Sequence, residues 1–189
     1  YDWLLKKFSS EGVEDTSAWN KNYSSSGTAS DIARDIIIDS NDNVYVVGSG
    51  NSWENWWLKK FSSGGTEDTS NWSKSLTSAG SKNDIAYGVA IDSANNIYVA
   101  GDGFNLAVAD SSNKDLWLKK FASNGTQDTT AWNKNYSSGG SVPDSIMSVA
   151  VGPMNDVYVV GYGTNISGSN TRMDWWIKSF EGIPDVTKC

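Results

Sequence analysis

The sequence predicts an all-β protein built from one repeated, antiparallel unit of four strands, and three observations lead to this prediction. First, a seven-residue segment occurs four times, as DWLLKKF, NWWLKKF, DLWLKKF and DWWIKSF. Second, the landmarks between these copies keep a constant spacing: a Trp lies 11 residues after the final Phe of each of the first three copies, an Asp 12 residues further on, and a Tyr 14 residues after that Asp. Third, each period holds four short apolar segments separated by turn residues, as expected for strands.

The four segments of one period are called strands a, b, c and d. In the second full period, residues 85–92 are predicted to form strand a, 96–101 strand b, 116–121 strand c and 131–136 strand d. The three-residue stretch SAN between strands a and b is short enough for a tight hairpin turn. Glycine follows strand c in three periods, where a turn needs a positive φ.

Strand c is apolar on both of its faces. In the second copy, Trp57 and Phe61 point to one side, while Trp56 and Leu58 point to the other. A sheet with one face in water alternates apolar and polar residues, so both faces of this sheet are expected to be covered. Four-stranded antiparallel units packed face to face describe a β-propeller. The rival β-trefoil closes with three copies, whereas strand c occurs four times here.

The repeat resembles a known class of propeller. The segments GVAIDSANNIYVAG and SVAVGPMNDVYVVG look like β-propeller repeats of the SBBP class, and they are also similar to the related NHL repeats. The resemblance implies the propeller fold and mainly surface or secreted bacterial and archaeal proteins. It does not imply one function, because propellers host many unrelated activities.

Counting strands predicts one propeller segment over residues 1–189, with about three and a half blades. Residues 1–23 supply strands c and d of a first blade, 31–76 a second blade, 84–136 a third blade, and 144–189 a partial last blade. A closed propeller has roughly four to eight blades. Another copy of the chain, or the missing blades of a longer chain, is therefore expected to close the ring.

The first strand pair is expected to be incomplete on its own. Its side chains Trp3, Leu5, Phe8 and Trp19 would lack the strands a and b of their blade. Residues 148–161, from a second chain or from across the ring, are the predicted partner, because they form the strands a and b of the last repeat.

Composition excludes several function classes. The net charge of −7 and the pI of about 4.5 argue against a nucleic-acid partner. The chain has no His and a single Cys, Cys189, so zinc sites and Ser-His-Asp or Cys-His catalysis lack their residues, and neither metal nor cofactor is expected. No run of about 18 apolar residues is present to span a membrane. The Ser-, Asn-, Gly- and Thr-rich composition favours a secreted or cell-surface protein.

Variation between repeats points to one end of the blades. The a–b, c–d and d–a intervals are constant, whereas the b–c loop has 7, 14 and 13 residues in the three repeats. Such insertions gather on one face of a repeat protein, often the binding face. At this same face strand a begins with a recurrent Asp, and three residues later the repeats diverge. The candidate binding residues are Asp31, Arg34, Trp53, Asp84, Tyr87, Phe104, Asp144 and Met147.

Other interpretations of these residues stay open. The recurrent Asp favours a cap of the d–a turn over a ligand contact, and the divergence at Arg34 also fits drift at an exposed position. Glu–Asp pairs at 14–15 and 67–68 suggest structural turns rather than an acid–base pair, because the third copy reads Gln–Asp. Residues 39–43, DSNDN, alternate oxygen ligands as a Ca²⁺ loop does, but the equivalent turns lose this pattern, which favours a hairpin turn.

Three functions remain in competition. The first is a non-enzymatic scaffold that binds a partner protein through the b–c and d–a loop face. The second is a carbohydrate-binding propeller, suggested by Trp53 and Phe104, which have no counterparts in the other b–c loops. The third is an enzyme limited largely to carboxylate chemistry, which the loss of the Glu–Asp pair in the third copy disfavours.

Overall fold

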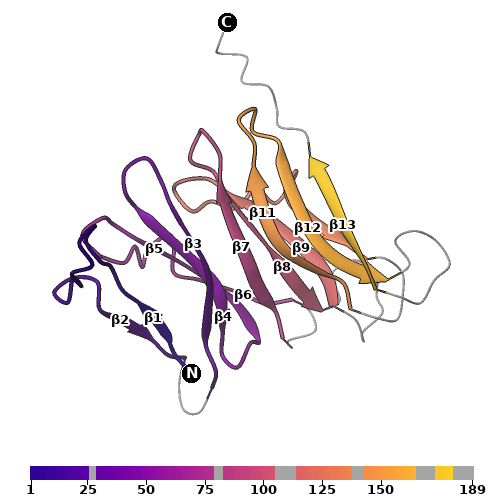
Figure 1. Ribbon diagram of the computed structural model, residues 1–189. Coiled ribbons are helices and arrows are strands. Elements are labelled where there is room, and N and C mark those ends of the chain that lie inside the picture. Colours follow the sequence, from indigo (N-terminus) through magenta and orange to yellow (C-terminus); the bar gives the residue numbers. More distant parts are fainter. Residues whose placement is uncertain (26–28, 79–82, 105–113, 138–142, 165–172, 181–189) are drawn as a thin grey trace, which may run out of the picture.

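The computed structural model describes residues 1–25, 29–78, 83–104, 114–137, 143–164 and 173–180 (Figure 1). These residues form thirteen strands and no helix. The strands are β1 (Trp3–Leu5), β2 (Lys21–Tyr23), β3 (Ile32–Ile38), β4 (Val44–Gly50), β5 (Asn55–Phe61), β6 (Lys74–Leu76), β7 (Ile85–Ile91), β8 (Ile97–Phe104), β9 (Lys114–Phe121), β10 (Asn133–Tyr136), β11 (Ser145–Val151), β12 (Val157–Thr164) and β13 (Met173–Phe180).

The strands form four antiparallel sheets that follow the order of the chain. The sheets are β1-β2, β3-β4-β5-β6, β7-β8-β9-β10 and β11-β12-β13. Strand a of the repeat is β3, β7 or β11, strand b is β4, β8 or β12, strand c is β1, β5, β9 or β13, and strand d is β2, β6 or β10. The sheets fan out from β1-β2 at one end to β11-β12-β13 at the other (Figure 1). The prediction of an all-β fold with propeller blades is confirmed.

An aspartate organises the a–b turn in the second and third blades. The Asp39 carboxylate accepts hydrogen bonds from the backbone N–H of Asn43 at 2.9 Å and from the Tyr45 hydroxyl at 3.1 Å. Asp92 repeats both bonds in the next blade. Asp42 adopts a φ of 59° in this turn, a conformation that Asp and Asn tolerate. Residues 39–43 therefore form a hairpin turn, as the comparison between repeats favoured.

Each first strand carries a β-bulge at the same place. The register between β7 and β8 shifts around Tyr87, which has no partner in β8. Arg34 and Met147 hold the same position in β3 and β11. Opposite the bulge lies Gly101, where a Cβ would be 2.0 Å from the backbone oxygen of Ile85. The second strand requires glycine here because the bulge brings the backbone of the first strand against it.

Hydrophobic clusters fill the space between successive sheets, as the two apolar faces of strand c predicted. Two indoles link neighbouring blades directly. Trp3 donates its Nε1–H to the backbone oxygen of Ser49 at 2.9 Å, and Trp56 donates to that of Asp102 at 2.9 Å. The acceptors are equivalent residues in β4 and β8, so one bond recurs at two interfaces. Trp175 holds the same place in β13, where it is 81 % exposed.

A second set of tryptophans joins the outer parts of the blades. Trp19 donates to the backbone oxygen of Ser63 and Trp72 to that of Ser123, both at 3.0 Å. Strand d is shorter than the sequence pattern predicted. Both tryptophans therefore lie in the turn before strand d and not in the strand itself. The prediction that the recurrent tryptophans pack between blades is confirmed for these side chains.

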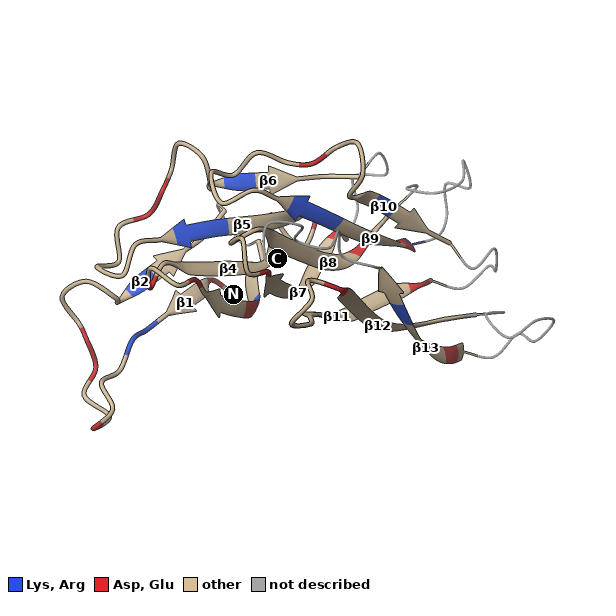
Figure 2. Cartoon of the chain, turned by 90° about the horizontal axis from the view of Figure 1, so that it is seen from above, with Lys and Arg blue, Asp and Glu red and all other residues tan. Residues whose placement is uncertain are grey.

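Strand c carries lysines, which are the blue segments of β5 and β9 in Figure 2. Lys59 Nζ is 4.5 Å from the ring centre of Tyr23 in the preceding blade, and Lys178 Nζ is 3.7 Å from that of Tyr136. Such cation–π contacts let a charged residue cover an aromatic ring.

The first strand pair is better covered than the sequence suggested. Trp3, Leu5 and Trp19 are only 1 %, 6 % and 3 % exposed, because the sheet β3-β4-β5-β6 packs over them. Of the four side chains expected to lack cover, only Phe8 is exposed. The neighbouring blade thus covers Trp3, Leu5 and Trp19, although strands a and b of their own blade are not among the described residues. Within this chain, residues 148–161 belong to β11 and β12, which pair with each other, and β11 packs against β7 and β8. The pairing of residues 148–161 with the first strand pair stays a prediction.

Candidate functional site

The three β-bulges place the divergent residues in one row along the first strands. Arg34, Tyr87 and Met147 are the bulged residues of β3, β7 and β11, and these three strands pack side by side. The guanidinium carbon of Arg34 lies 5.4 Å from the ring centre of Tyr87. Arg34 and Met147 are exposed and Tyr87 is half-buried. The bulge directs side chains out of the regular ladder, so the row presents a cation, a phenol and a thioether on a rigid backbone.

The recurrent aspartates of this face are structural. Asp31 accepts hydrogen bonds from the backbone and hydroxyl of Ser25 in the d–a turn and from the Asn51 backbone N–H in the b–c loop, the last at 2.7 Å. Asp84 makes the same bonds to Ser78 and Phe104. Burial raises the pKa of Asp84, although these hydrogen bonds act in the opposite direction. The interpretation of these two aspartates as caps of the d–a turn is confirmed.

The third aspartate, Asp144, is also buried. Its backbone N–H donates to the Lys114 backbone oxygen at 2.9 Å, which joins the start of β11 to β9 of the preceding blade. The b–c segments 105–113 and 165–172 and the terminal segment with Cys189 lie outside the described residues.

The first b–c loop holds Trp53 in an unusual backbone conformation. Asn51, Ser52 and Trp53 have consecutive φ values of 54°, 61° and 72°. This left-handed region is unfavourable for a bulky residue, and such strain concentrates at functional sites. The Asn51 amide donates to the Glu54 carboxylate at 2.7 Å, which closes the loop. Trp53 is 40 % exposed, so the loop presents an aromatic ring to solvent.

A polar cluster that the sequence analysis missed lies beside Tyr87. Asp102 is buried between the third and fourth blades, where it accepts hydrogen bonds from Lys114 Nζ at 3.1 Å and from the Ser145 hydroxyl at 3.0 Å. The Lys114 Nζ also lies 5.9 Å from the ring centre of Phe104. Asp102 is the middle residue of a Gly-x-Gly segment that reads Ser and Tyr in the other repeats. That divergence was the available signal.

Burial shapes the electrostatics of this cluster. It raises the pKa of Asp102 to about 6, while the positive charge of Lys114 and the Ser145 hydrogen bond act in the opposite direction. Burial also raises the pKa of the Tyr87 hydroxyl to about 12. The negative charge of Asp102 raises this pKa further, and the positive charge of Arg34 lowers it. Tyr87 therefore remains a neutral hydrogen-bonding group at physiological pH.

We expect D102N to change how stability depends on pH. As pH rises from 3.8 to about 6, the unfolded chain releases the Asp102 proton while the folded chain retains it. Across this pH window, the free energy of unfolding of the wild type should therefore fall by about 2 kcal/mol relative to that of D102N. Urea unfolding of both proteins at about pH 4 and pH 7 measures the difference. If the difference in stability between the two proteins did not change with pH, Asp102 would not retain its proton in the folded chain as described.

Among the described residues, no cluster of three or more His, Cys, Asp or Glu side chains could hold a metal ion, and no helix is long and apolar enough to cross a membrane. The Glu67–Asp68 pair forms a turn. The backbone of Glu67 makes an isolated β-bridge with Phe61, and its carboxylate forms an ion pair with Lys59 at 2.7 Å. The Asp68 backbone N–H donates to the Lys60 backbone oxygen. This agrees with the structural interpretation of the Glu–Asp pairs.

Successive antiparallel sheets, packed face to face with their first strands together, are the blades of a β-propeller fold. The family model of the SBBP beta-propeller repeat matches residues 25–53 and 71–103. The chain therefore contains SBBP β-propeller repeats, as the resemblance of its sequence indicated. A search of curated proteins gives no match. The two matched segments include Arg34, Trp53, Tyr87 and Asp102.

Proposed function

We propose that the chain is a non-enzymatic scaffold, secreted or displayed on a cell surface, that binds a partner protein through its loop face. The loop face consists of Arg34, Trp53, Tyr87, Phe104 and Met147. The observation that supports this proposal is the bulge row. The backbone of the bulge and its facing glycine recur in the three blades whose first strand is described, while the bulged residue differs each time.

The residue types of the loop face suit a protein partner. Arg, Tyr, Trp and Met are enriched in protein interfaces, where they combine apolar area with a polar or adaptable group. Arg34 is held over Tyr87, and the Trp53 loop is tied to the blade by Asp31. Side chains placed in this way lose little freedom on binding, which favours affinity.

Point variants of the loop face test this proposal. A variant with R34S, W53S and M147S changes three side chains that are each at least partly in solvent and should leave the fold intact. We expect the wild type to retain a partner in pull-downs from its native source and the variant to lose it. The matched control is V13S with M154S, two exposed residues in turns at the opposite end of the blades. Equal recovery with all three proteins would contradict the proposal.

Trp53 favours one second candidate, a carbohydrate ligand. An exposed indole beside the Asn51 amide and the Glu54 carboxylate offers a stacking surface and planar hydrogen-bonding groups, which a sugar ring requires. A glycan array that gives binding to the wild type and none to W53A would support this candidate. An array without binding above background would exclude it for the sugars tested.

A further inference from the structure

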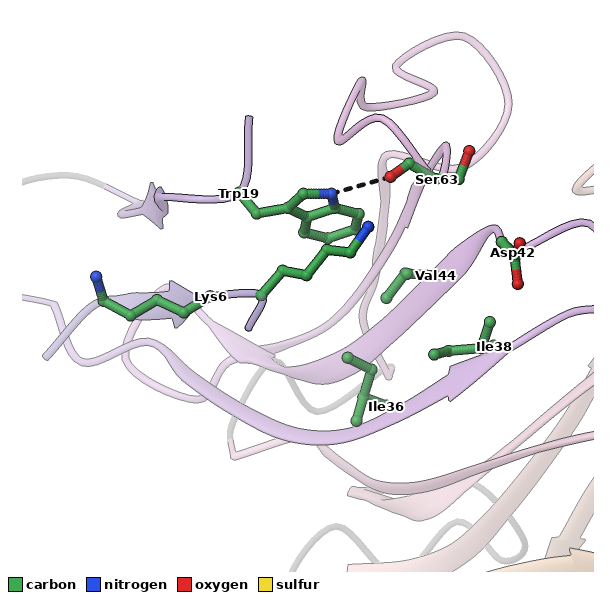
Figure 3. A pocket seen from close by; sticks show the side chains of 8 residues that line it. Lys6, Trp19, Ile36, Ile38, Asp42, Val44 and Ser63 are labelled. Atoms are coloured by element: carbon green, nitrogen blue, oxygen red, sulfur yellow. Dashed lines mark hydrogen bonds between the residues drawn. The ribbon is translucent and has the colours of Figure 1, made fainter. Parts of the chain in front are cut away.

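An apolar groove lies beside the first blade, at the other end of the chain from β13. The groove has a volume of about 370 Å³ and lies between residues next to the β1-β2 pair and residues of β3 and β4. It is lined by Lys6, Lys7, Trp19, Ile36, Ile38, Asp42, Val44 and Ser63. Figure 3 shows Trp19 on one side of the groove, with its bond to Ser63, and Ile36 and Ile38 on the other.

The repeat shows what normally covers the isoleucine side of this groove. Ile36 and Ile38 of β3 are 57 % and 56 % exposed. Val89, which holds the place of Ile36 in the next blade, is 5 % exposed because it packs in a cluster with Tyr45 and Val47 of the preceding strand b. The preceding blade has no strand b among the described residues. The groove therefore lies where strands a and b of the first blade would stand.

The other side of the groove has a matching gap. Trp72 and Trp132 each meet the strand-b tyrosine of their own blade edge-on, with ring centres 4.9 Å apart. Trp19 is their equivalent in the first blade, where β1 and β2 supply no such tyrosine. The lysine just before the final Phe of strand c also contacts this tyrosine: Lys60 Nζ is 5.0 Å from the Tyr45 ring centre.

Lys120 likewise lies 5.1 Å from the ring centre of Tyr98. Lys120 Nζ also lies 5.6 Å from the ring centre of Trp132, and the equivalent Lys7 lies 5.9 Å from that of Trp19, at the edge of the groove. Trp19 and Lys7 thus form two sides of a three-residue arrangement whose tyrosine is supplied by strand b in the other blades.

The backbone of β1 offers a hydrogen-bonding edge to the same space. In the second and third blades, strand c pairs with strand b along its whole length, β5 with β4 and β9 with β8. Within the described residues β1 pairs with β2. A strand laid in the groove would therefore find an open ladder as well as apolar walls.

We propose that this groove binds a β-hairpin of stated chemistry: the first two strands of an SBBP-type repeat, with an Asp six residues before a Tyr. The tyrosine ring would meet Trp19 edge-on beneath Lys7, and the apolar residues of the hairpin would cover Ile36 and Ile38. Its second strand would pair antiparallel with β1, which is strand addition to a sheet edge. The groove and the loop face are separate surfaces, so this inference does not depend on the proposed function.

A second folded copy of the chain does not fit as the occupant. Its candidate hairpins are β3-β4, β7-β8 and β11-β12, and each is already paired with the third strand of its own blade. A copy could donate one of them only by breaking that ladder and exposing the cluster behind it. The groove therefore fits a hairpin that no other blade already holds.

A synthetic peptide of residues 31–50 tests the proposal, because it carries Asp39 and Tyr45 at the required spacing and contains no tryptophan. Titration into the intact chain, followed by the indole N–H signals in ¹H–¹⁵N spectra, should give saturable binding that shifts the Trp19 signal. A peptide with Y45A should bind at least about tenfold more weakly, since it lacks the ring that meets Trp19.

The chain variant I38K should also weaken binding by at least about tenfold, because it places a charge in the apolar groove. This variant should fold, since Ile38 is more than half exposed. M154K, at an exposed site in the turn of the last blade, is the matched control and should bind like the wild type. Three results would overturn the proposal: no saturable binding, equal binding by the Y45A peptide, or self-association of the chain that I38K abolishes.

Discussion

Replacing Trp56 with alanine should destabilise the chain by about 3–5 kcal/mol, the usual cost of removing a fully buried tryptophan. Trp56 has no exposed surface, its ring centre lies 4.7 Å from that of Trp117, and its indole donates to the Asp102 backbone oxygen at 2.9 Å. The variant loses the ring packing between the second and third blades and leaves a buried carbonyl without its donor. Such a loss approaches the whole net stability of many domains.

The repeat provides a control for this substitution. Trp175 occupies the same position in β13 but is 81 % exposed. W175A should therefore change the free energy of unfolding by no more than about 0.5 kcal/mol. Urea denaturation followed by circular dichroism compares the two variants with the wild type. Similar losses in W56A and W175A would show that burial between blades does not distinguish these positions.

The second large loss of stability is expected when Gly101 is replaced with alanine. A Cβ at this position would lie 2.0 Å from the Ile85 oxygen and 2.9 Å from the Ala86 Cα, both of them backbone atoms that no side-chain rotation can move. The bulge at Tyr87 must then open or the β7-β8 ladder must separate. We expect a loss of about 3 kcal/mol, at the upper end of the usual cost of overpacking.

Gly64 is the control for G101A, because the nearest atom to its added Cβ is the Ser62 hydroxyl at 3.9 Å. G64A should remain within about 0.5 kcal/mol of the wild type. Thermal and urea unfolding give both values. A G101A protein as stable as G64A would mean that the bulge does not bring the two strands together as described.

Much of the fold could be predicted from the sequence because comparison of the repeats shows which positions must keep the same residue. A residue that returns at fixed spacing, such as Tyr45 and Tyr98, serves the same contact in each blade, here the bond to the turn aspartate. Repetition also separated the blades and assigned each strand to its place within a blade. The length of strand d was less predictable, because Trp72 packs toward the next blade from the turn before the strand.

The candidate site was predictable only in part. Divergence between repeats indicated Arg34, Tyr87 and Met147, but the β-bulge that places them in one row depends on pairing between strands, which a single sequence does not reveal. The Asp102 cluster was missed because its partners Lys114 and Ser145 come from a neighbouring strand and from the next blade. The groove beside Trp19 was missed as well, because it depends on how the first strand pair packs against its neighbour.

Consecutive repeats of this chain pack face to face as propeller blades. Hydrogen exchange of the ten Trp indole N–H groups, resolved by ¹H–¹⁵N NMR, tests this packing most directly. Among the indoles that bond to the next blade, those of Trp3 and Trp56 should exchange slowly, while those of Trp53 and Trp175 should exchange rapidly with solvent. Rapid exchange at Trp56, or protection of Trp175 equal to that of Trp56, would contradict the account.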